Sequence, residues 1–193
     1  MKQDHHPQKL FSFLSSNKLA VFSLFFCILI STLAHSGYIH RRNHYAAQLN
    51  NYILSAANTL DDIRSHPDNL SDDDFQILYE KLITISVFQN TAYPGHTAVS
   101  FDGFHCIYTI LRTGHTYNGE QLCEPFSADD SLSSGELDFL RTLYDDLNNL
   151  SQALTEHQEK SLCVNIKHIN HLLNAFDEKY EYGSQIYSVI HPD

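Results

Sequence analysis

Cysteines carry the most specific chemistry in this chain, which has 193 residues and four cysteines. Cys106 and Cys123 bracket much of a long polar connection, residues 114–130, and connections of that length are uncommon without a purpose or a brace. In an oxidising compartment, a disulfide there would stabilise the fold by about 3 kcal/mol in the chain-entropy model. Cys27 lies in an apolar run, so Cys163 is left over, and an odd number counts against a disulfide framework. Cys106 and Cys123 are the candidate pair.

Histidine is abundant, with 13 residues in the chain, and a metal site would need several of them to converge. His168 and His171 are three apart and would share a helix face, and Cys163 lies two turns before His171. However, the sequence has no HExxH motif, no paired CxxC motif and no EF-hand pattern. Histidines scattered over solvated faces explain the count, so we predict no metal site and no cofactor.

Aspartates occur in adjacent runs that suggest calcium at first sight. The run 72–74 follows Ser71 and is typical of the first turn of a helix, where acids favour the helix dipole. The pair 145–146 is interpreted as part of a solvated helix face. Neither run has the spacing of a calcium loop.

Catalytic motifs are also missing from the sequence. It contains no GxSxG, no SxxK and no His–carboxylate pairing that spacing alone supports, so we predict no catalytic residues and no enzyme activity. The formal charge of the chain is −11, and the residues after Arg42 include seven basic and twenty-two acidic side chains, a formal charge of −15. Nucleic-acid binding relies on Lys and Arg to neutralise phosphates, so this charge excludes a nucleic-acid partner.

Helical periodicity dominates the residues that would have to position any site. Apolar residues recur at steps of three and four in four stretches. The stripes are Tyr45, Leu49, Tyr52, Ala56, Leu60 and Ile63; Phe75, Leu78, Leu82, Ile85 and Phe88; Leu137, Leu140, Tyr144, Leu147, Leu150 and Leu154; and Leu162, Ile166, Ile169, Leu173, Phe176 and Tyr180. They are heptad-like, as in a coiled coil, and each needs an apolar partner, so the sequence predicts a mainly α domain over 43–193 built as an antiparallel helical bundle.

The ends of the last two helices are signalled by polar residues. Ser133 and Glu136 have the spacing of a capping box. A polar break is expected at 156–159, and Ser161 is expected to cap the final helix, which would pack antiparallel to the preceding one.

The middle of the chain allows two interpretations. Asp102-Gly103 between two apolar segments is typical of a hairpin, which would give an α+β fold. The apolar residues also step by three, four and three, at Phe101, Phe104, Tyr108 and Leu111, which indicates a helix with one tolerated glycine. We favour the helix because its neighbours are helical. Asn118-Gly119 indicates a second turn, inside the long polar connection.

An uncharged apolar run, residues 19–34, is the strongest signal in the chain, and it extends through residue 39. About 20 helical residues cross a hydrocarbon core of about 30 Å, so the sequence predicts a transmembrane helix over 19–39 that contacts the lipid bilayer. The alternative is a cleaved secretory signal, because 32–34 and 34–36 match the small-x-small cleavage pattern. The segment before Lys18 is long for such a signal, which favours an uncleaved signal anchor.

Orientation follows from the flanking charges. Lys2, Lys9 and Lys18 precede the run, whereas Arg41 and Arg42 follow it, a small positive-inside bias toward a cytoplasmic tail over 1–18. The acidic domain gains nothing from anionic cytoplasmic lipid, which favours the same orientation. We therefore expect a single-pass protein of the cell membrane with its C-terminal domain extracytoplasmic.

Two functions remain after these exclusions. The first is a membrane-anchored domain that acts through contact with a protein partner or with itself, as an assembly, scaffold or sensory module. The alternative is an extracytoplasmic domain that binds a ligand or metal through the connection 114–130 and the histidines.

Overall fold

The structure is a computed structural model that describes residues 18–67, 72–91, 102–117, 120–126 and 131–180. The predicted tail lies, apart from Lys18, outside the described residues. The chain divides into two compact units, 1–41 and 42–193, and each is described by itself. The predicted domain over 43–193 and its boundaries stay a prediction.

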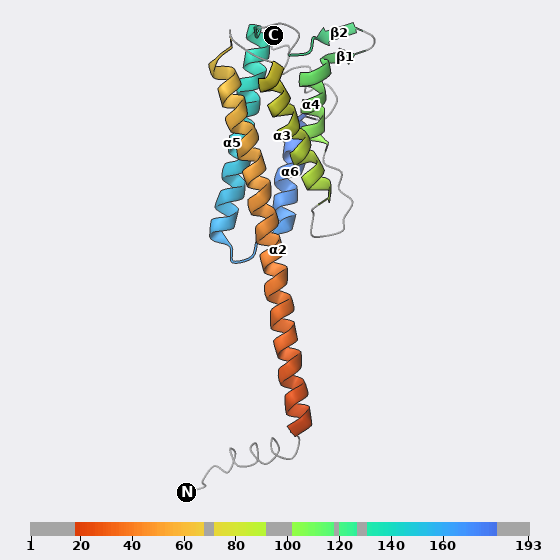
Figure 1. The fold of residues 1–193 in the computed structure, drawn as a ribbon, viewed down its shortest axis with the longest axis vertical. Helices are drawn as coiled ribbons and strands as arrows, with labels where there is room; N and C mark the ends of the chain where they lie inside the picture. Colours follow the sequence, from red (N-terminus) through yellow and green to blue (C-terminus); the bar gives the residue numbers. More distant parts are fainter. Residues whose placement is uncertain (1–17, 68–71, 92–101, 118–119, 127–130, 181–193) are drawn as a thin grey trace. The chain divides into compact units, whose positions relative to one another are not determined.

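Helices make up most of the described residues, which confirms a mainly helical protein (Figure 1). The elements in chain order are α2 (Lys18–Ser65), α3 (Asp72–Thr91), α4 (Gly103–Thr113), β1 (His115–Tyr117), β2 (Glu120–Cys123), α5 (Ser134–Lys160) and α6 (Ile166–Tyr180).

The first unit contains the N-terminal part of α2. Residues 18–41 are exposed except for half-buried Ile39, and this stretch is long and apolar enough to cross a membrane. The side chain of Thr32 donates a hydrogen bond to the carbonyl of Leu29 at 2.8 Å, so its hydroxyl is satisfied within the helix. That matters in hydrocarbon, where an unpaired polar group is costly.

The second unit has one hydrophobic core, to which all the predicted stripes contribute. Most stripe residues are fully buried, and Tyr52, Phe88 and Tyr144 pack against the core partly buried. The exceptions are half-buried Leu137 and exposed Leu162. Between helices, Tyr79 of α3 donates to the carbonyl of Leu111 at 3.0 Å.

The segment after Asp102 is helical, so the alternative hairpin around Asp102-Gly103 is wrong: Phe104 to Tyr108, its second strand, form the first turns of α4. The helical spacing of the apolar residues prevails over the strand spacing because it lets the helix pack on α6. Phe104 is fully buried and stacks on Phe176 of α6 with ring centroids 4.6 Å apart. The residues of the first strand, 96–101, lie outside the described part of the chain.

Gly103 begins α4 where it meets α6. Its N–H donates to the carboxylate of Asp177 at 2.7 Å, and a Cβ placed there would lie 2.4 Å from that oxygen and 3.0 Å from the Asp177 Cα. The close approach of Asp177 at this point therefore favours a residue without a side chain.

We expect Gly103→Ala to lower the free energy of unfolding by about 1–3 kcal/mol, because the methyl group displaces the Asp177 carboxylate from the Gly103 N–H and crowds the Asp177 backbone. Thermal unfolding of the full chain in detergent measures the effect. Gly37→Ala is the matched control, since no atom lies within 4 Å of the added carbon. Equal stability of the two variants would contradict the close contact.

A small hairpin occupies the first half of the predicted polar connection. β1 pairs antiparallel with β2, with Tyr117 opposite Glu120, on either side of the predicted Asn118-Gly119 turn, which itself lies outside the described residues. The long polar connection over 114–130 therefore contains two short strands, 115–117 and 120–123, that were not predicted. The two strands have three and four residues, which is too short for an alternation of apolar and polar residues to be recognised in the sequence.

The last two helices correct one predicted boundary. The capping box is confirmed, with Ser133 and Glu136 bonding each other's backbone N–H. The predicted break at 156–159 is wrong, because α5 continues to Lys160, and Ser161 ends α5 rather than capping α6. Asn165 caps α6 instead, accepting from the N–H of Lys167 at 3.1 Å.

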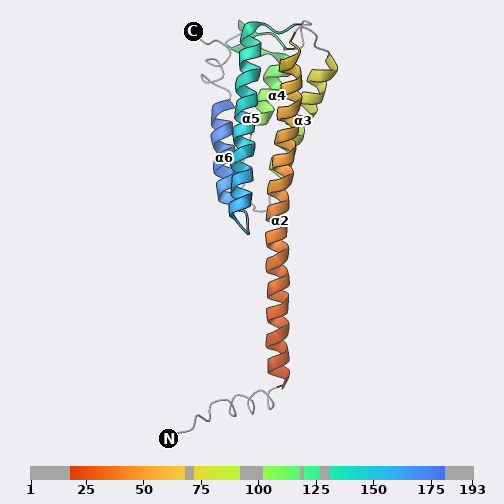
Figure 2. The same ribbon diagram turned by 90° about the vertical axis from the view of Figure 1, so that its left-hand side faces the viewer.

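The two glutamates and the glutamine of that supposed break are good helix formers, and Lys160 pairs with Glu156 one turn away at 3.0 Å. Their polarity therefore marked an exposed face and not an end. Figure 2 shows α5 and α6 side by side, joined at one end by the loop 161–165.

Candidate functional site

The most prominent surface of the described residues is the apolar one on α2. Large side chains stand exposed all round the helix, including Leu24 at 63% and Ile28 at 54%. The exposed apolar residues of this part are Leu19, Val21, Phe22, Leu24, Phe25, Phe26, Ile28, Leu29, Ile30, Leu33 and Tyr38. A helix that is apolar all round belongs in a protein core or in lipid, and this stretch of the first unit is not covered.

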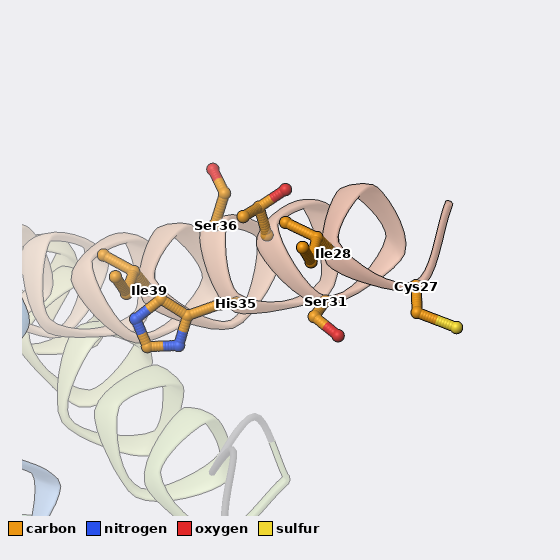
Figure 3. Close-up of a pocket in the computed structure, with 7 residues that line it drawn as sticks. Cys27, Ile28, Ser31, His35, Ser36 and Ile39 are labelled. Carbon is orange, nitrogen blue, oxygen red and sulfur yellow. The ribbon is translucent and has the colours of Figure 1, made fainter. Parts of the chain in front are cut away.

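A shallow hollow on the same surface is lined by Cys27, Ile28, Ser31, Thr32, His35, Ser36 and Ile39. Figure 3 shows that these side chains project from successive turns of one helix. No second element contributes a wall, so the hollow has the geometry of a helix surface and not that of a ligand pocket.

The residues that could bind a metal are dispersed. Among the residues that the structure describes, no group of three or more His, Cys, Asp or Glu side chains is close enough to hold an ion. Cys163 lies in the loop between α5 and α6, and His168 and His171 are on exposed positions of α6.

One of the two cysteines of the predicted disulfide has a described side chain. Cys106 is buried in α4 at 3% exposure, whereas the side chain of Cys123, at the end of β2, lies outside the described part. The pairing of Cys106 with Cys123 stays a prediction.

A side-chain clamp holds the α5–α6 loop against α2 at the start of the second unit. The Asn43 amide donates to the carbonyl of Leu162 at 3.0 Å and accepts from the N–H of Val164 at 2.9 Å. Arg42 approaches the sulfur of Cys163 at 4.0 Å. One asparagine thus fixes the loop by both of its polar atoms, which we call the Asn43 clamp.

Replacing Asn43 with alanine removes both bonds of the Asn43 clamp. At about 0.5–1.5 kcal/mol each, the loss lowers the free energy of unfolding by roughly 1–3 kcal/mol. Asn51→Ala is the matched control, since Asn51 is exposed on the same helix. Urea unfolding of the two variants in detergent measures the difference, and equal midpoints would show that the clamp does not hold the loop.

Two histidines meet beside the clamp. The ring of His157 on α5 lies 4.5 Å from that of His168 on α6, and its Nε2 accepts from the N–H of Asn165 at 2.9 Å. Burial and the neighbouring His168 lower the pKa of His157. Because a protonated Nε2 cannot accept a hydrogen bond, protonation of His157 breaks its link to the loop.

Acid is therefore expected to loosen this end of the domain. A histidine whose pKa is lowered by folding stabilises the folded state above its ordinary pKa of about 6.5, and that stabilisation is lost as the pH falls through the lowered pKa. The thermal midpoint of the chain should fall between about pH 7.5 and pH 5, and less so in His157→Gln, which keeps an acceptor without titrating.

The exposed His171 provides the control for this titration. His171→Gln should follow the unaltered chain over the same pH range. If His157→Gln also follows it, the acid sensitivity arises elsewhere.

Further along α2, a buried group of three polar side chains, the polar triad, fixes this helix against α5. Asn50 accepts from the Ser151 hydroxyl at 2.7 Å and donates to the Thr155 hydroxyl at 2.9 Å. Asn50 and Ser151 are 8% and 4% exposed, so their polar atoms depend on each other. A shift of one helix along the other would leave these groups unpaired, so the triad selects one register.

Asp146 corrects the interpretation of 145–146 as a solvated face. Asp145 is exposed, but Asp146 pairs with Lys179 of α6 at 2.6 Å and accepts the Tyr180 hydroxyl. Burial, followed by this hydrogen bond to Asp146, raises the pKa of Tyr180, so the phenol stays neutral. The predicted position of 72–74 in a first turn is confirmed, because α3 begins at Asp72.

Sequence reasoning missed Asn43, Asn50 and His157. Their partners lie more than 100 residues away for the two asparagines, and eight residues away across a turn for His157. The available signal was weak: a polar Asn50 directly follows core Leu49.

The exposed apolar helix, the Asn43 clamp and the histidine pair are the features that bear on function. Comparison of the chain with protein-family models, with curated proteins and with solved structures found no match.

Proposed function

We propose that the chain is a single-pass membrane protein whose helical domain acts through protein contact, as an assembly, scaffold or sensory module. No catalytic role is assigned to it. The observation that carries the proposal is the change of character along α2, which is exposed and apolar over 18–39 and contributes buried residues to a core from Tyr45 onward.

The length of the apolar part supports a span. Residues 18–39 of α2 are helical and rise about 33 Å at 1.5 Å per residue, which matches a hydrocarbon core of about 30 Å. Tyr38 near one end and Arg41 just beyond it are typical of the interface, where aromatic rings and basic groups meet headgroups. The span is proposed as an uncleaved anchor in the cell membrane.

For the domain over 43–193 we propose an antiparallel helical bundle. The five-residue loop 161–165 supports it, because short connections make successive helices antiparallel neighbours. The ion pair of Asp146 with Lys179 and the stacking of Phe104 on Phe176 supply contacts between its helices.

The domain is proposed to lie outside the cytoplasm. Its formal charge of −15 after Arg42 and the small excess of lysine before the span both favour this orientation. Protease added to intact cells should then digest the domain, whereas protection would place it inside.

A groove between α2 and α3 supports a function through protein contact. Ile77 is 46% exposed and lines this groove, and Val87, ten residues further along α3, is 54% exposed. The groove is lined by Tyr52, Ser55, Ile77, Glu80, Lys81 and Thr84. Exposed apolar and aromatic side chains beside polar ones are found in protein interfaces, which combine an apolar core with a polar rim.

Crosslinking in intact membranes, followed by detergent extraction, tests the proposed contact. The unaltered chain should give a species heavier than the monomer, and Ile77→Glu with Val87→Glu should weaken it. Gln152→Glu, at an exposed position of α5, is the control and should not. Monomer alone from the unaltered chain, across several crosslinker lengths, would contradict a function through contact.

A further inference from the structure

We propose that α2 pairs with α2 of a second copy of this chain, in parallel and in register, through an exposed face of the second unit. This face, called the exposed α2 face, comprises His44, Ala47, Asn51, Leu54 and Asn58. The inference rests on the proposed function through protein contact and names the partner, a second copy of the chain.

The exposed α2 face lies on the side of the helix opposite to the core. Leu49 and Ala56 are fully buried, and each is followed two positions later by an exposed asparagine, Asn51 and Asn58. Two positions turn the side chain by about 200° in a helix of 3.6 residues per turn. The whole face is exposed except for half-buried Ala47.

Charge is absent from this part of α2. Residues 43–60 contain no Asp, Glu, Lys or Arg, so the seven basic and twenty-two acidic residues after Arg42 all lie beyond Leu60. The exposed face of α5, by contrast, carries Asp138 and Glu159. Because the centre of a protein interface is depleted of charged residues, the composition of the exposed α2 face is that of a surface covered by protein.

The same charge selects the partner. Two copies that each carry a formal charge of −15 after Arg42 repel one another wherever their acidic surfaces meet. The exposed α2 face lets two copies touch without bringing carboxylates together, whereas a basic partner would be drawn to the acidic faces instead. A second copy is therefore the occupant that suits an uncharged face on an acidic domain.

Spacing along the exposed α2 face suits two parallel helices. His44, Asn51 and Asn58 are seven residues apart. Ala47 and Leu54 repeat this interval three residues later. The pattern is that of the a and d positions of a coiled coil, in which an asparagine at a fixes the register. An amide both donates and accepts, so each asparagine can bond the same residue of the other copy across a two-fold axis.

The groove between α2 and α3 borders this face. Ser55, which lines the groove, lies one helical turn from both Asn51 and Asn58. Polar residues at a positions cost a coiled coil stability, so the pairing is expected to be weak by itself. It is therefore tested at the high local concentration of a reconstituted membrane.

Single cysteines on the exposed α2 face test the pairing in the full chain. The background is Cys27→Ser, which removes an exposed native cysteine. Three variants are made in it: Asn51→Cys, Asn58→Cys and, at an exposed position of α5, the control Gln152→Cys. Each is reconstituted in phosphatidylcholine vesicles, oxidised with copper phenanthroline and analysed on a non-reducing gel. Thermal unfolding checks that each variant is folded.

We expect Asn51→Cys and Asn58→Cys to form a disulfide-linked dimer several-fold above the Cys27→Ser background, because facing positions bring the two Cα atoms within the reach of a disulfide. Gln152→Cys should stay at the background. Leu54→Glu added to Asn58→Cys should reduce the linkage several-fold, since it places two carboxylates opposite each other, whereas Leu54→Gln should reduce it less.

Three results would overturn the inference. Linkage of Asn51→Cys alone would indicate an antiparallel pair, in which Asn58 faces His44. Equal linkage of Asn51→Cys, Asn58→Cys and Gln152→Cys would indicate random collision. Linkage of neither α2 variant above the background would show that the exposed α2 face is not paired.

Amine-reactive crosslinking of the unaltered chain in the same vesicles and in intact membranes separates this failure from that of the proposed function. A heavier species in the membranes without cysteine linkage would leave a function through contact with another partner and overturn the pairing. Monomer alone in every experiment would overturn both.

Discussion

Arginine at two positions of the apolar helix, Leu24→Arg with Ile28→Arg, is expected to release the chain from the membrane. Both side chains are exposed near the middle of the proposed span. Each arginine costs about 2.5–3.5 kcal/mol at the centre of an inserted helix, so the pair costs roughly 5–7 kcal/mol before the lost leucine and isoleucine are counted. That is more than a single marginal span can lose and remain inserted.

Fractionation followed by alkaline washing measures the result. Leu54→Arg with Ile77→Arg is the matched control, because it places the same charges on exposed apolar positions of the second unit, and this variant should stay with the membrane. A double variant at Leu24 and Ile28 that still pellets would mean that a partner or another segment holds the chain.

Phe104→Ala is expected to have the largest effect on the stability of the domain. Phe104 is fully buried and joins α4 to α6 through its stack with Phe176. Removing a buried phenylalanine costs about 3–5 kcal/mol, from lost transfer free energy and from the cavity that remains. For a unit of this size, we expect the thermal midpoint to fall by roughly 6–20 °C.

The adjacent His105 supplies the control, since it is exposed on the same turn of α4. His105→Ala should change the midpoint by little, as substitutions at exposed positions usually do. Equal and small losses in both variants, measured in the full chain in detergent, would mean that α4 does not pack in the core as described.

Buried stripes account for most of what the sequence predicted correctly. Residues such as Leu49, Leu82, Leu147 and Leu173 recur at helical spacing because one face of each helix must leave water, and the structure buries all four. The capping box at Ser133 was equally local, since it depends on two side chains three residues apart.

Features that depend on distant partners were not predictable in the same way. The end of α5 was placed too early because polarity over 156–159 was interpreted as a break, whereas the helix ends where Ser161 becomes extended. Asn43 and His157 carried no local signal, because their partners in the α5–α6 loop come close only after α5 and α6 have packed.

The Asn43 clamp links the start of the domain to the loop at the end of α5. The same loop donates a hydrogen bond from the N–H of Asn165 to His157. Protonation of His157 would therefore weaken one of the contacts that hold the segment bonded to Asn43.

Alkaline extraction of membranes that contain the unaltered chain, with the intact mass of the extracted protein, tests the central claim most directly. The account predicts that the chain remains in the membrane pellet with the mass of all 193 residues. Recovery in the soluble fraction, or a mass that lacks the residues up to Ala34 or Ser36, would contradict an uncleaved membrane anchor.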